Sequence, residues 1–302
     1  MSAKTSDVKR KFKQGQRNPI TPYIFLAPSF ILLAIFFYGP FAFSIGASFT
    51  DWTLLGRYRS FVGLANYITV LSDNVFWISM RNTLVYTIFY LVGINVMALL
   101  IANGLVGFAK KYRQLMSAVF FIPYVCSMVA VTVMWNHMYQ PSYGILNFFL
   151  RSLGFQPLAW LTDGSVVLWS VAMMTIWRDT GFFVIIYIAG LLGISQVYYE
   201  AARVDGASAL QRFRSITLPM LANTTFFNTV FAVIVALQMF DQAWILTRGG
   251  PGFATRTVVI HLYQTAFAFY RMGEGSANAI ILFFLIMILT LIRIYFNKRI
   301  EE

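Results

Sequence analysis

The sequence predicts an all-α, polytopic membrane protein with six transmembrane helices. Of its 302 residues, 59% are hydrophobic and only 11% are charged, which lies outside the usual composition of soluble domains. A helix needs about 20 apolar residues to cross a hydrocarbon core of roughly 30 Å, and the chain contains six runs of that length. Strands of a β-barrel, with about 10 residues of alternating character, would give a different pattern.

The six expected spans follow one another with polar or turn-rich segments between them. They cover residues 22–49, 83–108, 115–139, 166–193, 223–246 and 276–296. The first is about twice as long as the apolar region of a cleavable secretory signal, so we expect it to be retained as a helix. Within the third, Pro123 lacks an amide donor, which favours a kinked helix.

Lysine and arginine residues predict the orientation of these spans, because short loops rich in cations stay on the cytoplasmic side. Six cations precede the first span, three lie in each of the second and fourth loops, and three lie near the C-terminus, whereas six lie on the opposite side. Both termini are therefore predicted to be cytoplasmic. We expect a basic cytoplasmic tail at 1–21 and a single transmembrane domain at 22–302.

Several functional classes have little support in the sequence. The net charge of +12 comes largely from cations at the membrane edges, so contact with anionic lipid headgroups explains it better than binding to nucleic acid. Cys126 is the one cysteine and cannot form an intrachain disulfide. With two histidines, His137 and His261, and no Cys/His cluster, a metal site is not expected. The residues also contain no recognisable catalytic constellation of an intramembrane enzyme.

The fourth span contains two ionisable residues, Arg178 and Asp179, near its middle. Each costs about 2.5–3.5 kcal/mol if it faces lipid, so both are expected to face protein or water. Adjacent helical residues point about 100° apart, so we expect that these two do not pair with each other. Asp241, toward the outer end of the fifth span, is a candidate partner for Arg178. An ion pair that fixes helix packing and a role in lining a solute path both remain open.

Four residues of the fifth span, Asn228, Ala232, Val235 and Met239, are spaced so that they lie on one stripe of a helix. A stripe with one amide and small side chains can border a cavity. Close packing against another helix is the alternative interpretation, because small residues favour such packing in membranes.

A polar segment at residues 199–219, YEAARVDGASALQRFRSITLP, interrupts the apolar pattern between the fourth and fifth spans. Good helix formers at 198–203 predict a short helix, and Gly206 accepts the positive φ that commonly ends one. A second short helix is expected at 207–215, and Pro219 marks the start of the fifth span. Such a pair of helices would project from the membrane and present hydrophobic and cationic side chains to a groove on a soluble partner.

Ten positions within this segment form a recognisable pattern. They are Glu200, Ala201, Ala202, Asp205, Gly206, Ala207, Phe213, Ile216, Leu218 and Pro219. This pattern resembles the EAA loop of binding-protein-dependent ABC importer permeases, and its form EAARVDGA with ITLP is similar to the carbohydrate branch, which includes maltose and glycerol-phosphate permeases. The segments SFTDW, FVGLANY, YGILN, TRGGP and YQTAF resemble the same family in the same order, so the resemblance covers nearly the whole chain.

The resemblance implies a type I importer permease in a bacterial inner membrane, assembled with a second similar permease, two cytoplasmic ATPase subunits and an external solute-binding protein. It also implies that residues 194–219 dock in a groove of the ATPase. The docking residues would be Glu200, Asp205, Gly206, Ala207 and Phe213. The chain has no GxxxxGK[ST] motif, so we expect a transport subunit that is not an enzyme and binds no cofactor, with ATP and Mg²⁺ held by the ATPase subunits.

The resemblance also places the solute path on the central helices near the middle of the membrane. The candidate residues for this path are Arg178, Asp179, Phe182, Asn228, Ala232, Val235, Met239 and Asp241. We expect a di- or oligosaccharide as the solute, with glycerol phosphate or another small polar solute as the alternative. An ion-coupled secondary transporter that uses Asp179 and Asp241 is a further alternative, but it leaves the EAA-like segment unexplained.

Overall fold

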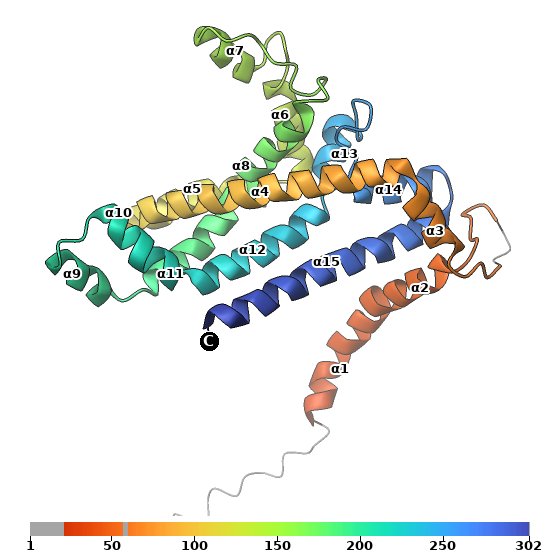
Figure 1. The fold of residues 1–302 in the computed structure, drawn as a ribbon, viewed down its shortest axis with the longest axis horizontal. Helices are drawn as coiled ribbons and strands as arrows, with labels where there is room; N and C mark the ends of the chain where they lie inside the picture. The colour runs from red at the N-terminus through yellow and green to blue at the C-terminus, as the bar shows by residue number, and fades with distance from the viewer. Residues whose placement is uncertain (1–20, 57–59, 302) are drawn as a thin grey trace, which may run out of the picture.

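The described part of this protein is predominantly helical. The computed structural model describes residues 21–56 and 60–301, and these residues contain no β-strand, only an isolated antiparallel bridge between Thr50 and Phe61. Most of the long helices lie roughly along one direction, and short helices lie at the ends of the bundle (Figure 1). The predicted basic tail lies outside the described residues except for Thr21, as do Arg57 and Arg59.

The first expected span forms one continuous helix. α1 (Thr21–Leu33) runs through a π-helical turn at Ala34–Tyr38 into α2 (Gly39–Ser48). None of the side chains from 23 to 40 is buried, and α1 points away from the other helices (Figure 1). α2 packs against α15 (Met272–Glu301), the last helix of the chain. The apolar surface of α1 is therefore left for lipid or another protein to cover.

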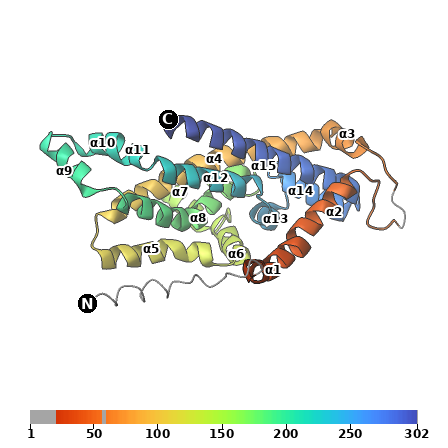
Figure 2. The ribbon, with the colours of Figure 1, turned by 90° about the horizontal axis from the view of Figure 1, so that it is seen from below.

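Two long helices, α4 (Asn74–Val106) and α8 (Val167–Leu192), pack along each other and form the centre of the core. Large buried side chains from both helices meet there and include Tyr86, Tyr90, Ile94, Met174, Phe183 and Tyr187. The bounds of α8 agree with the span expected at 166–193. Figure 2 shows α5 and α15 on opposite sides of the body, with α8, α4 and α12 between them.

α4 begins at Asn74, well before the span expected at 83–108. The Asp73 side chain caps it by accepting a hydrogen bond from the Val75 amide at 2.8 Å, which stabilises a helix start before the expected span. At 1.5 Å per residue, its 33 residues extend over about 50 Å, which exceeds the roughly 30 Å of a hydrocarbon core. Part of α4 therefore lies outside the membrane.

The third expected span is broken. α5 (Lys110–Val125) and α6 (Met128–Met138) meet at an angle of 94°, so the expectation of one kinked helix is wrong. The break lies at Cys126 and Ser127, which both have extended backbones, just after Pro123. Proline removes one helical hydrogen bond, and the carbonyl groups freed at the break find a different donor, described below.

The fifth expected span is interrupted as well. α12 (Ala222–Leu237) ends before residues 238–240, which are not helical, and α13 (Asp241–Thr247) follows. The Thr257 hydroxyl donates to the carbonyl oxygen of Met239 at 2.9 Å and so satisfies part of this non-helical backbone. A continuous helix over 223–246, as expected from hydropathy, is therefore wrong.

Among the described residues, four helices are long and apolar enough to cross a membrane, and two bent helix pairs raise the number to as many as six. These pairs are α5 with α6, and the helix at Ala209–Met220 with α12. The sixth expected span corresponds to α15. A membrane protein with four to six spans is thus established by length and composition, while six spans and cytoplasmic termini stay predictions.

Short helices complete the ends of the bundle. α3 (Ala65–Ser72) precedes α4, and α14 (Val258–Tyr263) continues into a π-helical turn at Gln264–Ala268. Both lie near the end of the bundle where α2 meets α15 (Figure 1). α7 (Ile145–Ser152) follows α6 and projects from the body (Figure 1).

α5 and α8 approach closely at Gly181. A Cβ atom at this position would overlap the carbonyl oxygen of Phe120 and would lie 2.7 Å from the Cα atom of Phe121. Glycine thus allows the α8 backbone to touch the α5 backbone, as small residues do at helix contacts in membranes.

Gly181→Ala should therefore destabilise the protein by about 1–3 kcal/mol, the usual cost of overpacking, because the α5 backbone must move. The measurement is the thermal unfolding midpoint of the purified protein in detergent. Gly104→Ala in α4 is the matched control, because a Cβ there meets nothing within 4 Å. A Gly181→Ala variant as stable as Gly104→Ala would contradict the close contact.

Candidate functional site

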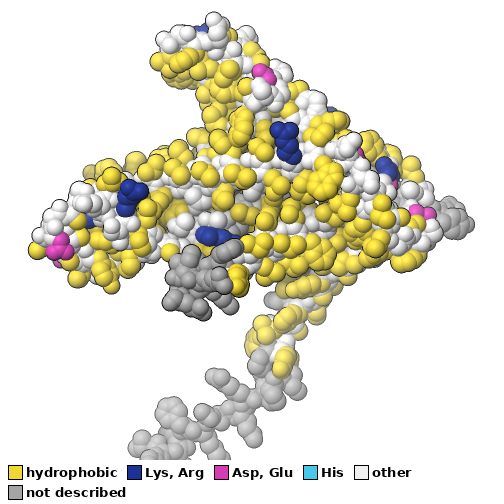
Figure 3. All heavy atoms as spheres, in the orientation of Figure 1, with side chains coloured by type: hydrophobic (Ala, Val, Ile, Leu, Met, Phe, Trp, Pro, Cys, Tyr) yellow, Lys and Arg dark blue, Asp and Glu magenta, His cyan; other side chains and the backbone are white. Residues whose placement is uncertain are grey.

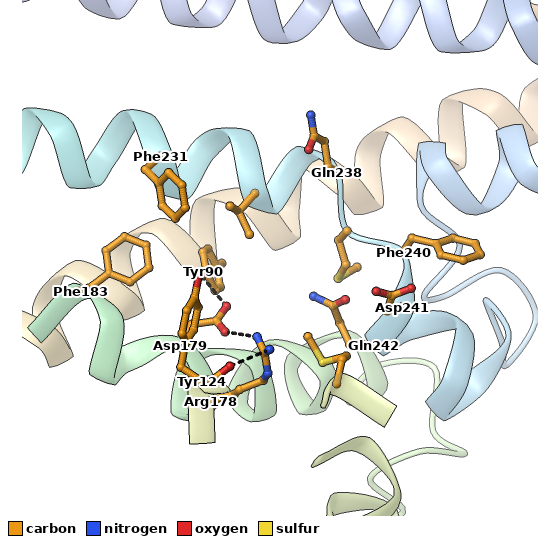
Figure 4. Close-up of a pocket in the computed structure, with 13 residues that line it drawn as sticks. Tyr90, Tyr124, Arg178, Asp179, Phe183, Phe231, Gln238, Phe240, Asp241 and Gln242 are labelled. Atoms are coloured by element: carbon orange, nitrogen blue, oxygen red, sulfur yellow. Dashed lines mark hydrogen bonds and ion pairs between the residues drawn. The ribbon is translucent and has the colours of Figure 1, made fainter. Parts of the chain in front are cut away.

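The two broken spans border one pocket of about 250 Å³. Its walls come from α4, α8 and α12, from the end of α5 and the start of α6, and from residues 238–240 with the start of α13. Phe183 and Phe231 lie at one end, whereas Gln238, Asp241 and Gln242 lie at the other (Figure 4). The pocket therefore has an aromatic end and an end that offers amide and carboxylate groups.

An ion pair lies in the middle of this pocket. Arg178 Nη1 is 2.7 Å from Asp179 Oδ1, and the Tyr90 hydroxyl donates to Asp179 Oδ2 at 2.8 Å (Figure 4). The expectation that Arg178 and Asp179 do not pair is thus wrong, because the long arginine side chain bends back to its neighbour. Asp241 lies across the pocket and is not the ion-pair partner of Arg178. The Asp179 side chain is only 5% exposed, so this pair belongs to the packed interior.

Arg178 also supports the break between α5 and α6. Its Nη2 donates to the carbonyl oxygens of Tyr124 at 3.1 Å and Cys126 at 3.4 Å. The last carbonyl groups of a helix lack partners within it, so these bonds satisfy the end of α5. The guanidinium carbon lies 5.3 Å from the centre of the Tyr124 ring, which adds a cation–π contact. Arg178 therefore borders the pocket and also contributes to helix packing, whereas its role along a solute path stays a prediction.

The structure brings together five of the eight residues expected along a solute path. The five that line the pocket are Arg178, Asp179, Val235, Met239 and Asp241. The other three, Phe182, Asn228 and Ala232, do not line it. The expected stripe is not one helical face, because α12 ends at Leu237 and Met239 lies in the non-helical segment beyond it. Whether the five act on a solute stays a prediction.

Aromatic rings surround the aromatic end of the pocket. Phe182 lies with its ring centre 4.9 Å from that of Tyr124 and 5.0 Å from that of Phe231. Phe182 is therefore a neighbour of the pocket wall. Sequence reasoning missed Tyr90 and Gln242 among the lining residues. Tyr90 could have been found as a tyrosine within an apolar run. Gln242 could have been found as the polar neighbour of Asp241.

The EAA-like segment forms two short helices, as expected. α9 (Gln196–Val204) is followed by Asp205 and by Gly206, which has a φ of 74°. The Ala207 amide donates to the Ala202 carbonyl at 2.9 Å, and the Gly206 amide donates to the Arg203 carbonyl at 3.0 Å. This pair of bonds is a Schellman motif, whose left-handed residue is usually glycine.

The second helix of the segment is longer than the expected 207–215. α10 (Ala209–Arg212) continues through a π-helical turn at Phe213–Thr217 into α11 (Leu218–Met220). The Ser208 side chain caps its start in a capping box with Gln211. A bend of 67° then separates it from α12, so Pro219 lies inside the second helix and not at the start of the span.

We call the segment from α9 to α11 the coupling arm. Figure 1 shows that it extends beyond α4 and α5 at one end of the bundle, and Figure 3 shows acidic and hydrophobic side chains at that end. Six of the ten pattern residues are exposed, namely Glu200, Ala201, Asp205, Gly206, Leu218 and Pro219. The half-buried four are Ala202, Ala207, Phe213 and Ile216. The arm thus presents one face outward while the other rests on the bundle.

One contact joins the two helices of the coupling arm, and two side chains pack the arm against the bundle. The hydroxyl groups of Tyr199 and Thr217 lie 2.9 Å apart and join α9 to the second helix. Tyr199 and Ile216 also pack against the core formed by α4 and α8. By contrast, Val204 is 89% exposed and Leu210 65% exposed, although they lie outside the spans. These two side chains are therefore accessible at the surface of the arm.

Comparison with known proteins identifies the family. No family model matches the chain. A probable ABC transporter permease protein of Pyrococcus horikoshii is 35% identical to it over 291 residues, which make up 95% of this chain and 99% of that protein. The chain belongs to the ABC transporter permeases. Permeases of this family are transport components.

Two further proteins are similar to this permease. A trehalose/maltose transport system permease protein of Thermococcus litoralis is 35% identical over 237 residues, 78% of this chain and 79% of that protein. A bacterial alginate ABC transporter has been solved in complex with an alginate pentasaccharide-bound periplasmic protein. One of its chains superposes on this permease with a TM-score of 0.80 and is 24% identical to it in sequence. The match covers 93% of the permease and 94% of that chain. The permease is therefore a multi-pass membrane protein with the fold of that transporter chain.

A second pocket of the permease, next to the start of α4 and to α14, contains several charged groups that are close to one another. His261 Nε2 lies 3.7 Å from Asp73 Oδ2, and His261 Nδ1 lies 3.5 Å from Arg256 Nη2. Burial, together with Arg256, lowers the pKa of His261 to about 4, although Asp73 opposes this shift. Arg271 forms an ion pair with Glu274 in the same pocket. The contact between Asp73 and His261 joins the start of α4 to α14, so this part of the cluster contributes to packing.

The Arg178–Asp179 pair provides a test of the first pocket. Arg178→Met should destabilise the permease by about 3–5 kcal/mol, because the Asp179 carboxylate stays buried without its cation. The measurement is the thermal unfolding midpoint in detergent. The double variant Arg178→Met/Asp179→Asn removes both charges and should recover the part of that loss that comes from the unpaired carboxylate. Equal losses in the single and double variants would contradict an energetic role for the pair.

Proposed function

We propose that this permease is a membrane subunit of an ATP-driven importer that carries a di- or oligosaccharide across a bacterial inner membrane. The observation that carries the proposal is the likeness to the trehalose/maltose permease, which extends over 78% of the chain. The sequence pattern of the coupling arm supports the same branch of the family. The alternative of an ion-coupled transporter accounts for neither feature.

The geometry of the first pocket suits a sugar. The aromatic side chains Phe183 and Phe231 at one end offer apolar surface to the C–H groups of a pyranose, and Gln238, Asp241 and Gln242 offer hydrogen-bonding groups to its hydroxyls. In this chain alone the pocket measures about 250 Å³, which is below the roughly 300–1,000 Å³ of common ligand sites. We infer that a second permease completes the site across the open side.

The coupling arm is proposed to dock into a groove of a cytoplasmic ATPase. Glu200, Asp205 and Gly206 are exposed, and Val204 adds an apolar contact beside them. Two ATPase subunits would hold ATP and Mg²⁺, and an external solute-binding protein would deliver the sugar. Closure of the ATPases on nucleotide would then move the arm and rock the helices behind it between two packed states.

Two substitutions in the arm test this docking. Glu200→Lys reverses an exposed charge, and Gly206→Pro cannot adopt the observed φ of 74°. Each should weaken association with the ATPase by about 30-fold, the loss of one contact worth about 2 kcal/mol, while membrane insertion stays normal. Lys111→Glu, a charge reversal in the first turn of α5 and outside the arm, is the control. The measurement is the amount of ATPase that copurifies with each variant, and normal copurification with both arm variants would show that the assignment is wrong.

Transport by the assembled complex tests the sugar. In proteoliposomes with the partner ATPases and the solute-binding protein, ATP hydrolysis and uptake should rise with an α-linked disaccharide or a longer oligosaccharide. Glycerol phosphate serves as the comparison, because it is the principal alternative solute. Stimulation by glycerol phosphate and not by sugars would contradict the sugar assignment but leave the importer intact. Uptake that follows an ion gradient without ATP would contradict the importer itself.

A further inference from the structure

An apolar groove lies between α4, α12 and α15 on the outer surface of the permease. Its volume is about 380 Å³. Aliphatic side chains such as Leu91, Val233 and Leu289 form its walls. Leu84 and Ile88 on α4 are 36% and 64% exposed, so the groove opens outward. It is separate from the pocket at the broken spans, which shares none of these lining residues.

One cation lines this groove. Arg293 on α15 forms no ion pair with any described residue, and its Nε is out of contact with solvent without a hydrogen-bond partner. Its guanidinium carbon lies 5.5 Å from the centre of the Phe226 ring, a cation–π contact that holds the group beside the groove. A cation in a membrane-spanning helix requires a compensating partner, and no described residue supplies an anion to this one.

The depth of Arg293 indicates what that anion is. At 1.5 Å per residue, Arg293 lies about 30 Å along α15 from Met272, close to the thickness of a hydrocarbon core. The guanidinium is therefore at the level of the headgroups on one side of the membrane, with the groove extending from it toward the membrane centre. Figure 1 shows that this end of α15 lies toward the coupling arm, the side predicted to be cytoplasmic.

We propose that the groove and Arg293 bind an anionic phospholipid of the cytoplasmic leaflet. One acyl chain lies in the groove, and the phosphate accepts charge-assisted hydrogen bonds from the Arg293 guanidinium. An apolar helix of another protein would cover the groove and shield the guanidinium from water and headgroups. The cation would then be buried without an anion, which is costly in a low dielectric. Charge complementarity thus favours the lipid over a protein segment.

Native mass spectrometry of the assembled importer tests this site. The complex is incubated with phosphatidylglycerol or with phosphatidylcholine of the same acyl chains, and the retained lipid is counted. The wild-type complex should prefer phosphatidylglycerol, and Arg293→Gln should lower that preference about fivefold, the effect of one cation near the membrane surface. Arg293→Lys keeps the charge and should retain part of the preference.

Two further variants separate the headgroup from the chain. Lys111→Gln removes an exposed cation elsewhere at the same end and should leave the preference unchanged. Val233→Phe fills the groove and should lower the retention of both lipids, with unfolding midpoints measured to show that each variant is folded. The proposal is overturned if Arg293→Gln keeps the wild-type preference or if Lys111→Gln lowers it equally. Photo-crosslinking of a benzophenone side chain at position 233 to a second permease would also overturn it, because the groove would then be a protein interface.

Discussion

Backbone hydrogen bonding inside the membrane is the constraint on which the rest of this structure depends. The hydrocarbon core has no water, so an unpaired amide or carbonyl group there is costly and spans usually stay helical throughout. This permease nevertheless interrupts two apolar runs, at 126–127 and at 238–240. Side chains from other segments take over freed carbonyl groups in both places, Arg178 at the first and Thr257 at the second. Irregular backbone is tolerated because protein groups surround it.

The pocket exists because these two interruptions lie opposite each other. A cation that satisfies carbonyl groups at this depth needs its own counter-ion, and Asp179 supplies it, held in turn by Tyr90 of α4. One polar network thus joins α4, α5 and α8, and the same atoms that hold the core together form a wall of the pocket. A shift of α8 relative to α4 would therefore change the shape of the pocket.

The coupling arm is inserted between the two helices that face each other across this pocket. α8 leads directly into α9, and α11 leads into α12 through the bend of 67°. The contact between Tyr199 and Thr217 joins the two halves of the arm, and Ile216 packs on the core. A force on the arm thus reaches both sides of the pocket through short, helical connections, which is the arrangement that the proposed coupling to an ATPase requires.

The sequence by itself determined the features that depend on local chemistry. Hydropathy located the apolar runs and the bounds of α8, and the EAA-like pattern predicted two short helices joined at Gly206, since only a residue without a Cβ readily adopts the required φ. It also identified Arg178 and Asp179 as residues that could not face lipid.

Only the tertiary structure decided where the spans break and which side chains meet. Arg178 binds a carbonyl group 52 residues away at Cys126, and Tyr90 binds Asp179 across 89 residues, so no local pattern encodes either contact. The same holds for the stripe expected in the fifth span, of which Val235 and Met239 line the pocket but Asn228 and Ala232 do not. Helical periodicity places residues on a common face only while the helix continues, and α12 ends at Leu237, before Met239.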